Sequence, residues 1–260
     1  MDVIHDMTHF HFTHSFFAFR LDRTNVLSTP WGTYIHALWH HNLVCWSSFH
    51  RCLAIEQGFP DSTRYVFGGV NTDFYRPDNY EKDGYLLFMG RMHPTKRPHI
   101  FIELARRMPQ EKFILSGSFG RQGTPDHAYY GRYYRELSRN LPNLVIEEDV
   151  SFKRQVQLYQ RAKSLIFPSQ AECFGLVLAQ ALSCGTPAIC SNEGAFPEII
   201  QEGKTGFLCD TLEEYINAIK NIDVIDPKDC VRDARQRFSR ERVAHDYLKV
   251  YHDAMDGKTW

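Results

Sequence analysis

Residues 164–178 read Ser-Leu-Ile-Phe-Pro-Ser-Gln-Ala-Glu-Cys-Phe-Gly-Leu-Val-Leu. A short apolar run ends at Pro168, a polar turn follows, and from Gly175 the chain continues as an apolar segment long enough for a helix. A buried strand followed by a loop and a helix is the repeating unit of parallel α/β sheets. The stretch therefore predicts one strand–loop–helix unit, with its polar loop at the carboxyl end of the strand.

The same alternation extends to both sides of this unit. Further strands are predicted at 85–89, 113–115, 143–146, 187–190 and 206–209, helices at 97–108, 128–139, 153–162 and 175–183, and three terminal helices at 212–222, 227–238 and 239–251. This pattern predicts a doubly wound, Rossmann-type parallel sheet. Such sheets bind ligands outside the carboxyl ends of their strands, so we expect a ligand at the loops after Met89, Ser116 and Phe167.

The composition excludes several classes of protein. The chain has 260 residues and a net charge of -1, so no overall field attracts nucleic acid or an anionic membrane. Its seven cysteines include no Cys-x-x-Cys pair and lie mostly in apolar runs, which indicates buried thiols of a cytoplasmic protein. No apolar run reaches the roughly 18 residues of a membrane span, and no signal peptide is recognisable. We therefore predict a soluble, intracellular protein.

The amino-terminal part has a different character. Eight of the 13 histidines lie in the first 50 residues. Short strands are predicted at 2–5, 25–28 and 43–46, residues 65–70 resemble a strand that runs into a glycine turn, and 71–82 form a polar linker. We expect two units: an amino-terminal α/β part over residues 1–76, and the sheet domain with its terminal helices over residues 77–260.

The first polar cluster is Gly-Arg-Met-His-Pro-Thr-Lys-Arg at 90–97. The first turn of a helix carries unpaired N–H groups and a positive dipole end, which disfavours cations there unless an anion joins them. The fork of Arg91 and the point charge of Lys96 suit the two phosphates of a diphosphate. A solvated basic turn is the alternative from these residues alone.

The second cluster is the loop at 168–175. Gly175 lets a ligand approach the start of the next helix, where the amides of Gly175, Leu176 and Val177 would point at a phosphate. Glu172 precedes this helix and can accept sugar hydroxyls, unless it only stabilises the helix dipole. Gln180 lies ~7–8 Å further along the helix, which suits a ribose beyond the diphosphate. A solvated helix residue is the alternative for Gln180.

A third cluster holds Cys-Gly-Thr-Pro at 184–187, Phe-Pro-Glu-Ile at 196–199 and Thr-Gly-Phe-Leu at 205–208. By themselves these are turns and strand ends, and Glu198 is a capping or surface acid. Taken together in this order, the three clusters resemble the donor domain of glycosyltransferase family 4, which has the GT-B fold. That family shows a Gly-Arg-x4-Lys element and then a Pro-Ser-x2-Glu-x-Phe-Gly element. The resemblance covers roughly residues 65–255.

The resemblance implies a function and a set of site residues. It implies that Arg91 and Lys96 hold a donor diphosphate and that Glu172 binds the transferred sugar, so these three are the expected catalytic residues. The expected donor-binding set adds Phe174, Gly175, Leu176 and Gln180. Gln180 stands where the family has a second glutamate, the ribose ligand. The implied reaction transfers a sugar from a UDP- or GDP-linked donor to a saccharide or lipid-linked acceptor, with retention and without a metal or cofactor, in the cytoplasm or at the membrane periphery.

The amino-terminal part departs from the family. Thr29-Pro30-Trp31 stands where members have Thr-x-His, and Trp31 cannot make that histidine's hydrogen bonds. The family's early strands and glycine-rich loop are missing, so we expect either a fragment or a shortened acceptor domain. Its aromatic residues should pack against the sheet domain, the carboxyl-terminal helix or another chain, the last by self-association. A nucleotide-sugar-binding remnant without transferase activity and a GT-B nucleotide-sugar epimerase remain as alternatives.

Two further patterns bear on other kinds of ligand. His9-x-His11-x2-His14 and His36-x3-His40 have spacings that occur in zinc sites, but no cysteine or carboxylate completes a set, and no metal site is predicted. The glycines at 117, 120 and 123 do not have the spacing of a dinucleotide-binding loop.

Overall fold

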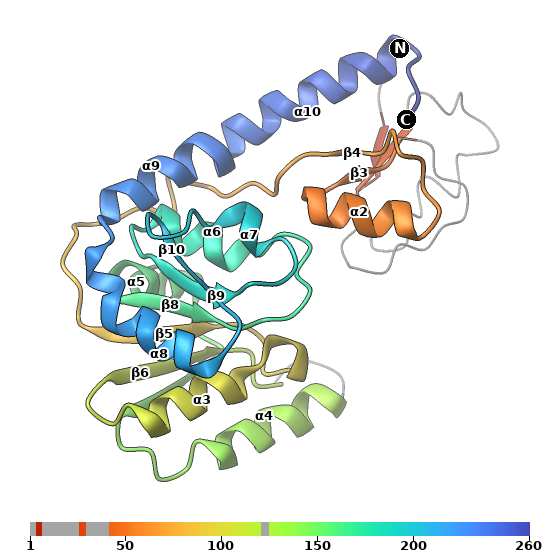
Figure 1. Ribbon diagram of the computed structural model, residues 1–260. Helices are drawn as coiled ribbons and strands as arrows, with labels where there is room; N and C mark the ends of the chain where they lie inside the picture. The colour runs from red at the N-terminus through yellow and green to blue at the C-terminus, as the bar shows by residue number, and fades with distance from the viewer. Residues whose placement is uncertain (1–3, 7–25, 30–41, 121–124) are drawn as a thin grey trace.

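The computed structural model describes residues 4–6, 26–29, 42–120 and 125–260 (Figure 1). The histidine patterns at 9–14 and 36–40 and Trp31 lie outside the described residues. The interpretations placed on them therefore stay predictions.

A six-stranded parallel sheet forms the larger part of the molecule. Its strands are β5 (Tyr85–Met89), β6 (Lys112–Gly117), β7 (Leu144–Glu148), β8 (Ser164–Phe167), β9 (Ala188–Ser191) and β10 (Gly206–Cys209). They lie in the order β10-β9-β8-β5-β6-β7, and every neighbouring pair is parallel. The chain therefore runs outward from β5 to β7 and returns to β8 on the other side of β5. This confirms the doubly wound sheet and places its topological switch point between β5 and β8.

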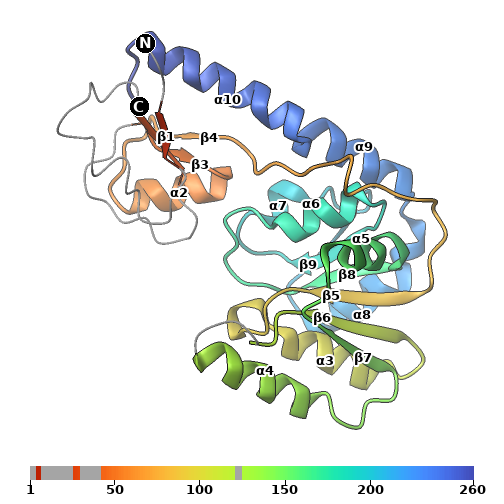
Figure 2. The same cartoon turned by 180° about the vertical axis from the view of Figure 1, so that it is seen from behind.

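Helices cover both faces of the sheet. They are α3 (Pro98–Arg107), α4 (Pro125–Leu137), α5 (Phe152–Arg161), α6 (Leu176–Ser183), α7 (Phe196–Ile199), α8 (Leu212–Asn221), α9 (Pro227–Phe238) and α10 (Arg240–Met255). α3 contacts α8 on one face, and α5 contacts α6 on the other (Figures 1 and 2). Because both faces are covered, β5, β8 and β9 are buried along their whole length, as their largely apolar sequences predict.

Capping residues fix where the later helices begin. The side chains of Ser151 and Ser239 accept backbone N–H groups at the starts of α5 and α10, and Asp226 does the same for α9. Thr211 and Glu214 form a reciprocal capping box at α8. These signals explain why the predicted helix starts at 212 and 227 agree with the structure.

The amino-terminal part contains two short parallel pairs and one helix. β1 (Ile4–Asp6) pairs with β2 (Val26–Ser28), and β3 (Val44–Cys45) pairs with β4 (Arg64–Tyr65). Helix α2 (Ser48–Glu56) follows β3 and was not predicted from the sequence. Its start signal is the N-cap Ser47, whose side chain accepts the N–H of His50.

Helix α10 crosses back from the sheet domain and completes this part (Figure 2). An apolar cluster combines Leu27, Val44 and Val66 with Val250, Ala254 and Trp260. The indole Nε1 of Trp260 donates to the Leu43 carbonyl over 2.9 Å, and the Trp260 carbonyl accepts the N–H of Asn42 over 3.0 Å. Of the amino-terminal aromatic residues expected to pack against another part of the protein, Trp46 is described, and it packs against the core of the sheet domain. Phe16, Phe17, Phe19, Trp31 and Trp39 lie outside the described residues, so the expectation for them stays a prediction. The division at residue 76 stays a prediction, since both ends of the chain share this cluster.

In the part of the chain that the structure describes, no helix has the length and apolar character needed to span a membrane.

Buried thiols predict how stability depends on pH. Burial raises the pKa of the Cys190 thiol well above its ordinary value. A group whose pKa is raised in the folded state contributes stability that is present below the unfolded pKa and lost as the pH rises above it. With an unfolded pKa of about 8.5, Cys190 should account for a loss of about 2 kcal/mol between pH 8 and pH 10.

Urea unfolding of wild type and Cys190→Ala under reducing conditions at both pH values measures this contribution. Between pH 8 and pH 10 the free energy of unfolding of the variant should fall by less than that of wild type. This holds even if the two proteins already differ in stability at pH 8. Equal losses would contradict the assignment.

Candidate donor site

A cavity of about 570 Å³ lies at the carboxyl ends of β5 and β8, at the switch point. Its walls are the loop after β5, the loop after β8, the first residues of α6, and Trp46 from the amino-terminal part. Arg91, Lys96 and Glu172 all line it, as do Phe174, Gly175 and Leu176. The structure thus brings together six of the seven residues that the sequence predicts for donor binding.

The loop after β5 carries Arg91. Gly117, at the end of β6, has φ 142°, and a Cβ there would lie 1.7 Å from the Gly90 carbonyl oxygen. Only glycine at position 117 therefore lets the end of β6 lie against this loop. Arg91 is exposed at the cavity wall, and its guanidinium makes no hydrogen bond or ion pair with another described residue.

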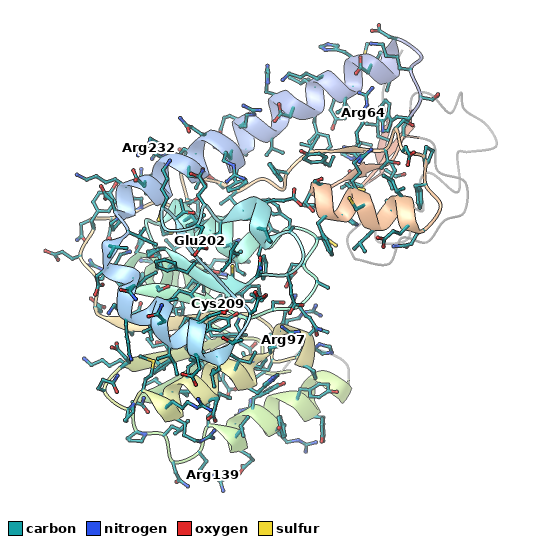
Figure 3. The ribbon with its side chains drawn as sticks, in the orientation of Figure 1. Arg64, Arg97, Arg139, Glu202, Cys209 and Arg232 are labelled. Atoms are coloured by element: carbon teal, nitrogen blue, oxygen red, sulfur yellow. The ribbon has the colours of Figure 1, made fainter. Side chains whose placement is uncertain are left out.

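Lys96 reaches across the cavity to Glu172. It ends a short 3-10 helix, Pro94–Lys96, and its Nζ donates to Glu172 Oε1. The side chains of Lys96 and Glu172 are 17% and 18% exposed, so the pair is largely shielded but still open to a ligand from the cavity. Arg97, labelled in Figure 3, follows in the left-handed conformation, with φ 49°. Its guanidinium pairs with Glu193 at 2.6 Å. Arg97 thus braces the loop, while Lys96 faces the cavity.

The loop that carries Glu172 is held from several sides. Ser169 Oγ donates to Glu172 Oε1 over 2.7 Å, and the Ala195 N–H donates to the Glu172 carbonyl over 3.0 Å. Ala171 has φ 49°, a conformation that a residue with a Cβ adopts only where its surroundings impose it. A Cβ at Gly194 would come within 2.8 Å of the Glu172 nitrogen. The carboxylate therefore has a fixed position before any ligand arrives.

The two loops are also joined to each other. The Gln170 N–H donates to the Thr95 carbonyl over 2.8 Å, and Ser169 Oγ, whose proton goes to Glu172, lies 3.2 Å from the same oxygen. Because of these bonds, the distance between the cationic loop and the Glu172 loop is set by the backbone.

Helix α6 begins at the cavity without a side-chain cap from the described residues. Its N-cap is Gly175, with φ 93°. A Cβ at Gly175 would lie 2.7 Å from the Phe196 ring, so glycine is needed there. Helix starts of this kind bind anions through their first amides and the positive end of the dipole. Arg91, Lys96 and α6 therefore give one end of the cavity a positive character.

Gln180 lies away from the other predicted residues. It is not among the described residues that line the cavity, and its Oε1 accepts the Tyr159 hydroxyl proton over 3.2 Å. Its role at a ribose stays a prediction.

Sequence reasoning missed two residues at the site. Trp46 lines the cavity, but its only sequence signal was its place at the end of an apolar run. Glu193, the partner of Arg97, lies far away in the sequence, and only the fold brings it near.

Cys173 also lines the cavity. Burial and, second, the charge of Glu172 raise the pKa of its thiol to about 12. Cys173 is therefore protonated and unreactive at neutral pH.

Among the described residues, no group of three or more His, Cys, Asp or Glu side chains could hold a metal ion. The positive charges at the cavity come from the protein's own side chains and backbone.

Comparisons with known proteins agree with this fold. The chain is 27% identical over 240 residues to the D-inositol 3-phosphate glycosyltransferase of Acidothermus cellulolyticus, covering 81% of this chain and 52% of that protein. It is 28% identical over 229 residues to the enzyme of that name from Corynebacterium aurimucosum, covering 75% and 52%. The chain thus spans about half the length of these curated relatives.

Solved structures share the architecture. A glycosyltransferase from Rickettsia africae superposes with a TM-score of 0.80 at 17% identity, covering 99% of this chain and 78% of that one. Anabaena HepE in complex with UDP-glucose superposes with a TM-score of 0.66 at 20% identity, covering 80% and 63%.

The family model described as "Glycosyl transferases group 1" matches residues 71–237, which include both loops of the cavity. That match covers well over half of the chain, and the structural neighbours are glycosyltransferases of the GT-B fold. The chain belongs to the group 1 glycosyltransferases.

Proposed function

We propose that this chain binds a UDP- or GDP-linked sugar in the cavity between β5 and β8 and transfers the sugar to an acceptor. The observation that carries the proposal is the convergence of Arg91, the Lys96–Glu172 pair and the open start of α6 on one cavity. Cations and backbone donors suit a diphosphate, and a fixed carboxylate suits sugar hydroxyls. The UDP-glucose complex of HepE, which has the same fold, supports this choice of donor.

The Lys96–Glu172 pair suggests how the donor enters. Each of the two groups has the other as its charged partner. An incoming diphosphate offers Lys96 a second anionic partner, and the carboxylate of Glu172, which Ser169 holds in place, can then accept a sugar hydroxyl. Binding of the donor thus exchanges one charge-assisted contact for two.

The proposed reaction needs positive charge where the nucleoside diphosphate leaves. Arg91, Lys96 and the α6 amides supply that charge, which supports a reaction without a metal ion. Retention of the anomeric configuration and transfer of a hexose are the outcomes that the family resemblance implies, and they form part of the proposal. Gln180 is proposed as the ribose ligand once its side chain leaves Tyr159.

A second candidate is donor binding without transfer. Gln180 in place of a charged ribose ligand, bonded to Tyr159, favours it. Incubation with UDP-glucose and GDP-mannose, with and without saccharide acceptors, distinguishes sugar transfer from donor binding alone. Release of nucleoside diphosphate with a glycosylated or hydrolysed product supports transfer. Binding without turnover supports the second candidate, and an epimerised donor would indicate an epimerase.

Replacing Arg91 by alanine should weaken binding of UDP and GDP by about 2–4 kcal/mol, the range for a charge-assisted phosphate contact that the bound nucleotide shields from solvent. Titration calorimetry measures the change. Arg107→Ala is the matched control, because Arg107 pairs with Glu103 and Glu213 outside the cavity. If both variants bind as wild type does, Arg91 does not hold the diphosphate.

Replacing Glu172 by glutamine should affect the binding of the free nucleotide and of the nucleotide sugar differently. The variant keeps the shape of the side chain, so free UDP or GDP should bind almost as it does to wild type. The sugar-bearing donor should bind more weakly, because a carboxylate accepts hydroxyl protons better than an amide does. Calorimetry with each nucleotide and its sugar conjugate tests this, and an equal loss for both ligands would make Glu172 a structural residue of its loop.

A further inference from the structure

The amino end of helix α2 is attached to the sheet domain by a carboxylate. Glu198, on the short helix α7, accepts the N–H of Ser48 over 2.8 Å with Oε2 and the N–H of Phe49 over 2.7 Å with Oε1. These are the first amides of α2, which have no partner within their own helix. The charge of Glu198 also lies at the positive end of the α2 dipole. Figure 1 shows α2 next to α7 across the boundary between the two parts.

A second bond joins the same end of α2 to the donor site. Ser47 Oγ accepts the His50 N–H over 3.0 Å and donates to the Cys173 carbonyl over 2.6 Å. Cys173 directly follows Glu172 in the loop that lines the cavity. The start of α2 is therefore in contact with the backbone that carries the proposed sugar ligand.

Glu198 itself is held by the sheet domain. Arg237, on α9, donates to the carbonyls of Glu198 and Ile199 and pairs with Asp233 at 3.1 Å. The side chain of Asp233 is only 4% exposed, so the acidic member of this ion pair is buried. The carboxylate thus projects from a fixed backbone toward the amino-terminal part.

Trp46 lies just before α2 and forms a cavity wall. It packs closely over the connecting segment: a Cβ at Gly68 would lie 2.8 Å from the Trp46 ring and 2.6 Å from the Phe174 ring. Since Trp46 is two residues from Ser48, its position depends on where α2 begins.

We propose that Glu198 is a positioning residue for donor binding: its carboxylate fixes the start of α2 against the sheet domain and thereby holds Trp46 as a wall of the donor cavity. The predicted effect of Glu198 on donor binding rests on the proposed function. The contact between Glu198 and the start of α2 does not depend on that function. Glu198 acts through α2 and Trp46 and does not line the cavity.

Amide hydrogen exchange on the full chain without ligand tests the contact. In Glu198→Gln and Glu198→Ala, the amides of Ser48 and Phe49 should exchange faster than in wild type, while the strands of the sheet keep their protection. Glu202→Gln is the matched control, because Glu202 accepts the Leu208 N–H within the sheet domain. Unchanged exchange at Ser48 and Phe49 in both Glu198 variants overturns the proposal.

A double-mutant cycle tests the route through Trp46. Glu198→Gln should weaken UDP-glucose or GDP-mannose binding about tenfold, which corresponds to the lower range for one charge-assisted hydrogen bond. In a Trp46→Ala background the same substitution should have little further effect, because its route to the donor is gone. Equal losses in both backgrounds overturn the proposal, since they show that Glu198 acts without Trp46. A wild-type chain that binds neither nucleotide sugar refutes the proposed function, and the exchange data then decide whether Glu198 fixes α2.

Discussion

Strands β5 and β8 are hydrogen-bonded neighbours, with Leu86 opposite Ser164 and Leu87 opposite Leu165. Their parallel pairing puts two loops that are distant in sequence at the same edge of the sheet. Arg91 and Lys96 follow β5, and Glu172 follows β8. If β8 paired elsewhere, the cations and the carboxylate would not share a cavity. The burial of both strands on both faces fixes this pairing, so the site depends on the core of the sheet.

The fold was predictable where apolar runs are short and bounded by turn residues. β8, β10 and α9 have the predicted bounds, since proline, glycine or a capping aspartate marks one end of each. Helix α2 was missed because its residues mix aromatic, charged and small side chains without a clear helical period. Partners from other elements, among them Glu198, contribute to its stability. Contacts with such distant residues cannot be predicted from the local sequence.

The site was predictable only in part, for a similar reason. Residue type and position before a helix singled out Arg91, Lys96 and Glu172, and the family resemblance supplied their roles. The direct Lys96–Glu172 contact and the Arg97–Glu193 brace join residues that are distant in sequence, so they required the fold. Trp46 belongs to the amino-terminal part and reaches the cavity only because α2 is attached to the sheet domain. The spacing of residues in the sequence does not predict contacts between the amino-terminal part and the sheet domain.

The shared cluster of α10 and the amino-terminal strands bears on how the chain folds as it leaves the ribosome. Leu27, Val44 and Val66 are synthesised early, but they pack against Val250, Ala254 and Trp260, which are synthesised late. The sheet domain between them has a core of its own, formed without residues of α10, and can form before α10 is synthesised. The amino-terminal strands therefore lack half of this cluster until α10 and Trp260 have been synthesised. During that interval their apolar residues are exposed to the cell's chaperones and to other nascent chains.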